Sequence, residues 1–113
     1  MNEPQLKNLL DDLDSAKAAC DGLSRLVVTR LAKKRIPYRA MLGTVELDGK
    51  VISPHIWVEA DGCLIDYRAR EQLGDDTRLP HGVIARDEVK ANYRGQSIVI
   101  DPLPDYLFEQ LVH

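Results

Sequence analysis

Cysteine, aromatic residues and long apolar runs are all scarce in this sequence. Its 113 residues include 2 cysteines, and aromatic residues make up 5% of the chain. No apolar stretch approaches the roughly 20 residues that a membrane-spanning helix needs, so we expect no membrane partner. The first residues, MNEPQLKNLLDDLD, are acidic and lack the apolar segment of a signal peptide. We therefore expect a cytoplasmic protein in which Cys20 and Cys63 are free thiols.

A strongly basic segment is also missing. The formal net charge is −3, and the nearest basic candidate, Lys33-Lys34-Arg35, is short and suits the end of a helix. Nucleic acid is therefore not an expected partner. Repeats, low-complexity segments and linkers are absent, whereas apolar residues make up 44% of the chain. These features predict a single domain over residues 1–113 with its own hydrophobic core.

Apolar residues in the first third of the chain recur at helical spacing. One set consists of Leu6, Leu9, Leu10 and Leu13, and a second consists of Leu23, Leu26, Val27 and Leu31. Asp14-Ser15 offers a cap or a break between the two sets, and Pro37 ends the second. Cys20 is expected near the start of the second helix, to within about three residues.

From residue 38 onward the apolar period changes to that of strands. We expect strands over residues 38–47, 51–60, 63–68 and 96–100, a loop over 71–82, and a short closing helix over 105–112. Helices followed by a mostly antiparallel sheet make an α+β fold.

The densest group of reactive side chains lies in HIWVEADGCLID, residues 55–66. A two-residue turn at Asp61-Gly62 would make His55 and Asp66 diagonal neighbours on one face of the hairpin. Their Cβ atoms would then lie about 7–8 Å apart or less, which is within reach of a side-chain hydrogen bond. Cys63 would point to the other face. A three-residue turn would shift the register and separate the pair.

A His–Asp pair prepares an imidazole for proton transfer. Asp66 would accept a hydrogen bond from one ring nitrogen, which fixes the tautomer and leaves the other nitrogen able to take a proton. A cysteine thiol that met this second nitrogen would become a nucleophilic thiolate, and a helix N-terminus would favour the thiolate further. Cys20 is in the position for this role.

The segments CDGLSRLVVTRLAKKRIPYRAMLG and HIWVEADGCLIDYRAR resemble the transglutaminase-like branch of the papain-like cysteine peptidase superfamily. The resemblance covers about residues 18–70 and implies a papain-like core, with N-terminal helices packed on a small antiparallel sheet. It implies Cys20 as nucleophile, His55 as general base and acid, and Asp66 as the orienting carboxylate, with no cofactor. The short His-to-Asp hairpin is similar to that of leader-peptide processing proteins in some bacterial peptide pathways.

The activity implied by this resemblance is that of a small thiol enzyme acting on an amide or isopeptide bond in a peptide or protein substrate. Cysteine peptidase, amidase, deamidase and transamidase activities all remain open. One departure is that SAKAA, before Cys20, lacks the glycine or polar residue that often precedes such a nucleophile. The alternative is a catalytically inactive member of the same fold that acts as a binding or adaptor module. A homodimer or a protein partner could complete the site of so small a chain.

Neighbouring residues have both functional and structural interpretations. Trp57 is expected to pack over the site or in the core, where it could shield the His–Asp hydrogen bond from water, and it is also a candidate for substrate binding. Arg68 is expected beside His55, where it would bind an anionic part of a substrate or form a surface salt bridge. A metal site made of His55, Asp66 and His81 would have suitable ligand types, but the spacing matches no known signature, so no metal is expected.

Overall fold

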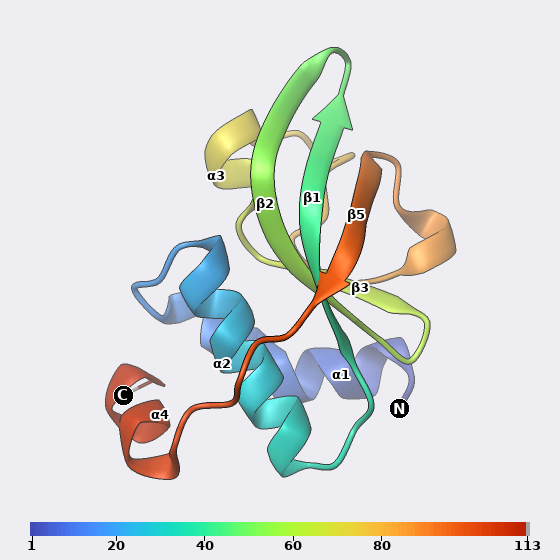
Figure 1. Ribbon diagram of the computed structural model, residues 1–113. Coiled ribbons are helices and arrows are strands. Elements are labelled where there is room, and N and C mark those ends of the chain that lie inside the picture. The colour runs from blue at the N-terminus through green and yellow to red at the C-terminus, as the bar shows by residue number, and fades with distance from the viewer. Residues whose placement is uncertain (113) are drawn as a thin grey trace.

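Helices α1 and α2 cover one face of an antiparallel five-stranded sheet in the computed structural model, which describes residues 1–112 (Figure 1). The helices are α1 (Glu3–Leu10), α2 (Cys20–Lys33), α3 (Ala69–Leu73) and α4 (Asp105–Val112), with 3-10 turns η1 (Asp11–Ser15) and η2 (Arg86–Glu88). The strands are β1 (Arg39–Leu47), β2 (Lys50–Ala60), β3 (Cys63–Asp66), β4 (Gly82–Ala85) and β5 (Asn92–Ile98). The predicted α+β class is confirmed.

The break between the two N-terminal helices lies where the sequence predicts it. A capping box of Asn2 and Gln5 starts α1, because each side chain accepts a hydrogen bond from the other residue's backbone N–H. The 3-10 turn η1 ends at Ser15, and Ala16 and Ala19 are extended. A new helix therefore begins after this linker, and Cys20 is its first residue.

The sheet has the strand order β4-β3-β2-β1-β5. The strand expected over residues 96–100 begins earlier, at Asn92, because residues 92–98 pair with β1. The expected loop over residues 71–82 is partly wrong, since α3 occupies its first residues. The strand β4 that follows pairs with β3 and was not anticipated. These three differences arise from pairing with a distant strand or from packing, which local turn signals do not contain.

The Asp61-Gly62 turn has the two-residue form that the sequence predicts. Ala60 pairs with Cys63, Glu59 with Leu64, and Val58 with Ile65. Both turn residues have a positive φ, 49° at Asp61 and 75° at Gly62, which this tight turn requires. The hairpin therefore has the predicted register. Its ladder ends at Val58 and Ile65, so β2 and β3 diverge just before His55 and Asp66.

The sheet separates two apolar clusters. The larger one, on the side of α1 and α2, includes Val58, Ile65 and Phe108 of α4. The smaller one, on the other side, includes Trp57, Leu64 and Tyr93 and is covered by α3 and the segments around it. Within residues 1–112, no helix is both long and apolar enough to cross a membrane.

Candidate functional site

His55 and Asp66 meet at the point where β2 and β3 diverge. The Nε2 atom of His55 lies 2.7 Å from Oδ2 of Asp66, and both side chains are buried. The pair spans the two strands diagonally, as the two-residue turn predicts. A carboxylate can only accept hydrogen bonds, so Nε2 carries the proton in this contact.

Two further donors hold the Asp66 carboxylate. The Tyr93 hydroxyl donates to Oδ2 over 2.7 Å, and the backbone N–H of Arg68 donates to Oδ1 over 2.9 Å. Burial, together with the adjacent Asp66 charge, raises the pKa of Tyr93 well above its ordinary value, so the hydroxyl stays a donor. The carboxylate is therefore fixed in one orientation, and the His55 ring with it.

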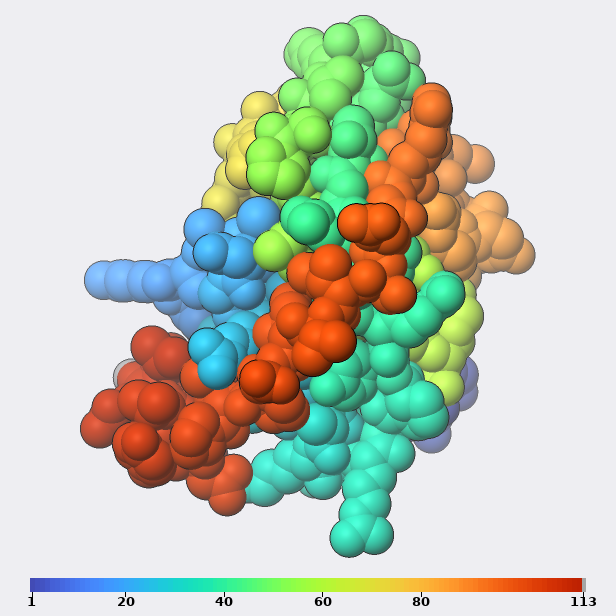
Figure 2. All heavy atoms as spheres, in the orientation of Figure 1, coloured from blue at the N-terminus to red at the C-terminus, as the bar shows by residue number. Residues whose placement is uncertain are grey.

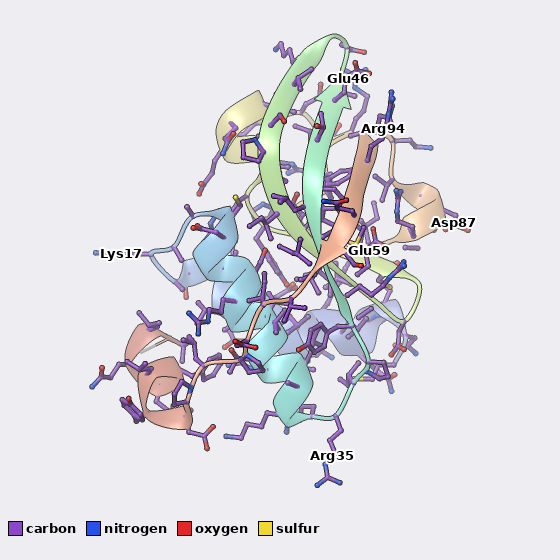
Figure 3. All side chains as sticks on the ribbon, viewed as in Figure 1. Lys17, Arg35, Glu46, Glu59, Asp87 and Arg94 are labelled. Atoms are coloured by element: carbon purple, nitrogen blue, oxygen red, sulfur yellow. The ribbon has the colours of Figure 1, made fainter. Side chains whose placement is uncertain are left out.

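Trp57 forms one wall around the histidine. Its ring is stacked on His55 with a centroid distance of 6.3 Å, and the Tyr93 ring meets it edge-on at 4.9 Å. The indole N–H donates to Glu59, which Figure 3 labels beside the strands. The expected packing of Trp57 over the site is thus present. Because Trp57 is only 1% exposed, its expected contact with substrate stays a prediction.

The other ring nitrogen of His55 has no hydrogen-bond partner among the described residues. Nδ1 is buried, and the exposed fraction of the whole residue is 0%. An unpaired buried polar atom costs about 1–3 kcal/mol of folding free energy, so proteins rarely keep one without a use for it. Nδ1 is the atom that a general base would present to a thiol.

Cys20 approaches this region from the first turn of α2. Ala19, the N-cap residue, makes no side-chain hydrogen bond to the helix, and Cys20 is partly exposed. One helical turn later, the Ser24 hydroxyl donates to the backbone carbonyl of Ile56. Residues four apart share a helix face, so Cys20 lies one turn beyond this contact, at the N-terminal end of α2. In Figure 1 this end of α2 faces the curved middle of β2.

A small hollow of about 10 Å³ lies between Cys20 and Asp66, and His55 is not among the residues that line it. Its lining includes Cys20, Ser24, Ile56, Asp66 and Arg68. Cys20 and Asp66 therefore border the same space, although the described residues include no hydrogen bond between Cys20 and His55. Cys63 lies in the apolar cluster under the helices, and burial, with the nearby Glu3 and Asp61 charges, raises the pKa of its thiol.

The position of Arg68 differs from the sequence-based expectation. Its side chain does not project from a strand beside His55, because β3 ends at Asp66 and Arg68 is the N-cap residue of α3. Arg68 is 5% exposed, and its guanidinium contacts the segment that precedes Cys20. The suggested role in substrate binding stays a prediction, and it would require Arg68 to release contacts that it already makes.

A wider groove of about 450 Å³ opens next to this hollow and shares Tyr67 and Arg68 with it. One wall is the segment from Asp14 to Ala18, and the other includes Arg70, Glu71, Asp75 and His81. Lys17 projects outward from the first wall, as Figure 3 shows. A bound chain in this groove would lie beside the N-terminal end of α2.

His81 lines this groove and does not lie with the His–Asp pair. Its Nε2 atom is 2.8 Å from Asp14. Burial opposes ionisation of Asp14, but hydrogen bonds from Arg68 and His81 outweigh it and lower the pKa of the carboxyl. Within residues 1–112, no three histidine, cysteine or acidic side chains converge as metal ligands.

Sequence reasoning did not identify Tyr93 or Asp14 as part of this region. Tyr93 lies before the expected strand, although the alternation of Tyr93, Gly95 and Ser97 could have extended that strand toward it. Asp14 looked like a helix cap. Its contact with Arg68 spans 54 residues, and no local pattern predicts so distant a contact.

Comparison with known proteins gives no match. No family model matches the chain, and neither curated proteins nor solved structures yield a similar one. The function must therefore be argued from the geometry of the site itself.

Proposed function

We propose that the protein is a small thiol enzyme of the transglutaminase-like type, which acts on an amide or isopeptide bond through Cys20, His55 and Asp66. The observation that carries the proposal is the unpaired and buried Nδ1 of His55, whose opposite nitrogen is held by Asp66. Such a ring can take a proton at Nδ1 while Asp66 stabilises the resulting imidazolium.

The reaction would begin with proton transfer from the Cys20 thiol to Nδ1 of His55. The thiolate attacks the carbonyl carbon of the substrate amide, and the backbone N–H of Cys20 is the candidate donor to the developing oxyanion. The C–N bond then breaks, and the imidazolium returns its proton to the leaving amine. Water hydrolyses the resulting thioester, or a second amine replaces it, so hydrolysis and transamidation share the first half of this reaction.

Three features of the fold support this assignment of roles. Cys20 is the first residue of α2, where the unpaired N–H groups and the helix dipole favour a negative charge. Asp66 cannot rotate away from His55, because Tyr93 and the Arg68 backbone also hold it. Finally, the groove beside Cys20 is large enough to hold part of a peptide.

Alkylation by iodoacetamide tests the nucleophile directly. Each thiol is followed by peptide mapping in the wild type, in His55→Gln and in Asp66→Asn at pH 7. We expect Cys20 to react at least about tenfold faster in the wild type than in His55→Gln, because the base is then absent. Cys63 is the internal control, since its burial and raised pKa should keep it unreactive while the protein is folded.

The chemical outcome is measured with dimethylated casein and a fluorescent primary amine. Peptide cleavage, a mass gain from deamidation, and incorporation of the amine distinguish the three reaction types, and Cys20→Ala is the negative control. The proposal is wrong if two results are found together. One is that Cys20 is alkylated at the same rate in the wild type and in His55→Gln, and the other is that the wild type and Cys20→Ala form equal amounts of product.

One observation favours a second candidate, a non-catalytic binding module of the same fold. The hollow beside Cys20 holds only about 10 Å³, close to the volume that a single water needs. If this hollow does not open, the wider groove could still bind a peptide or protein partner. An unreactive Cys20 in a protein that nonetheless forms a stable complex would identify this role.

A further inference from the structure

Arg68 makes an unusually complete set of contacts with the chain segment before Cys20. Its guanidinium donates five hydrogen bonds. Four of them reach residues 14–18, at the Asp14 carboxylate and at three backbone carbonyls, and the fifth reaches the carbonyl of Tyr67. The three carbonyls belong to Asp14, Ala16 and Ala18.

These contacts lie immediately before the nucleophile candidate. Ala18 is two residues from Cys20, and its carbonyl accepts from Nε of Arg68 over 2.7 Å. Ala16 and Ala18 cannot hold the segment through side chains of their own, and the N-cap residue Ala19 makes no capping hydrogen bond. Arg68 therefore supplies four hydrogen bonds that hold this segment from outside it.

The same residue also holds the opposite half of the site. The backbone N–H of Arg68 donates to Oδ1 of Asp66 over 2.9 Å, while Oδ2 accepts from His55. Arg68 thus links the carboxylate that orients the base to the segment that carries the thiol. The two halves are 46 positions apart in the sequence, from Cys20 to Asp66, and one further hydrogen bond, from Ser24 to the carbonyl of Ile56, joins α2 to β2.

We propose that Arg68 is the positioning residue that sets Cys20 against the His55–Asp66 pair. This inference rests on the proposed function. It assigns to Arg68 a role that acts through the Asp14–Ala18 segment and not through contact with substrate. Lysine could not replace it, because an ammonium has three donors on one atom, whereas the planar guanidinium reaches several acceptors at once.

Arg68→Lys tests the inference, with Arg35→Lys as the matched control. Arg35 undergoes the same substitution, but it is exposed, follows the end of α2 opposite to Cys20 and projects away from the protein (Figure 3). We expect Arg68→Lys to lower the rate of Cys20 alkylation by about tenfold to a hundredfold, because a displacement of the order of 1 Å is enough for such a loss. Arg35→Lys should leave the rate unchanged.

A double-mutant comparison separates positioning from general stability. In the wild-type background, His55→Gln slows alkylation of Cys20 if the proposed function holds. In the Arg68→Lys background, His55→Gln should have no further effect, since the thiol is already out of reach of the base. If His55→Gln slows alkylation of Cys20 as much in the Arg68→Lys background as in the wild type, the inference is overturned and the proposed function is left intact. Absence of the His55 effect in the wild type would instead remove the proposed function and this inference together.

Reactivity of Cys63 reports whether the variant remains folded, because that thiol is buried at 5% exposure. If Arg68→Lys exposes Cys63, Asp14→Asn serves in its place. Asp14 is partly exposed, so the variant is expected to fold. The substitution removes the carboxylate that Arg68 contacts. In the Asp14→Asn background, the factor by which His55→Gln slows alkylation of Cys20 should then be at least about threefold smaller than in the wild type. An undiminished effect in Asp14→Asn would overturn the inference.

Discussion

At the scale of single residues, the His55–Asp66 contact follows from a short turn and the alternation of side chains along strands. Asp61-Gly62 sets the register, and the register places the two side chains on one face. A third partner of the Asp66 carboxylate, Tyr93, lies outside the hairpin. Tyr93 belongs to β5, at the far edge of the sheet, and donates to the same oxygen as His55.

Tyr93→Phe should lower the free energy of unfolding by about 1.5–3 kcal/mol near pH 8, because it removes a buried hydrogen bond to a charged group. The pKa of Tyr93 is raised in the folded state. The contribution of its neutral hydroxyl is therefore complete below the ordinary pKa of about 10 and declines as pH rises above it.

Urea denaturation of the wild type and Tyr93→Phe between pH 8 and pH 11 measures this effect. The difference in unfolding free energy should be constant up to about pH 10 and should narrow at higher pH. A difference that widens with pH would mean that the hydroxyl does not depend on Asp66 as described.

At the scale of helices and strands, close approach between β1 and β5 positions Tyr93. Gly43 and Gly95 pair across these strands, and a Cβ atom on Gly43 would lie 1.9 Å from the carbonyl oxygen of Arg94. Gly43 also pairs with His55 on β2. A glycine in the middle of β1 is thus required by packing between backbones and not by a turn.

Gly43→Ala should therefore destabilise the fold by about 3 kcal/mol, because the backbone of β5 would have to move. The control is Gly49→Asn in the β1–β2 turn, where φ is 81° and no other atom lies within 4 Å of an added Cβ. Asparagine accepts this conformation, so the control should change stability by no more than about 0.5 kcal/mol. Similar thermal midpoints for Gly43→Ala and the wild type would contradict the close contact.

At the scale of the whole molecule, the C-terminal helix completes the larger apolar cluster. Phe108 of α4 is 6% exposed and packs with residues of α1 and α2, and the Arg30 guanidinium lies 5.3 Å from its ring centre. Figures 1 and 2 show the segment after β5 crossing over α2 to reach α4. The last element of the chain thereby contacts the helix that carries Cys20.

Phe108→Ala should lower the free energy of unfolding by about 3 kcal/mol, through lost burial and the cavity that remains. Tyr106→Ala is the control on the same helix, since Tyr106 is 68% exposed, and it should change stability by less than about 0.5 kcal/mol. Equal denaturation midpoints for the two variants would show that α4 does not pack as described.

The sequence by itself determined the α+β class, the two N-terminal helices with Cys20 at the start of the second, and the hairpin register that joins His55 to Asp66. These features depend on contacts between near neighbours, on the period of apolar residues and on turn chemistry, all of which a single chain displays locally. The break before the helix of Cys20 was predictable from Asp14-Ser15, but the contacts that hold this segment were not.

Only the tertiary structure decided the surroundings of that pair. The contact of Arg68 with the Asp14–Ala18 segment, the hydrogen bond from Tyr93 to Asp66, and the pairing of β4 with β3 all join residues that no local period relates. Each depends on how the strands and helices pack, and on the rule that a buried charge must find partners wherever the fold supplies them. The sequence position of Arg68 offered no sign that its side chain would lie against the Asp14–Ala18 segment.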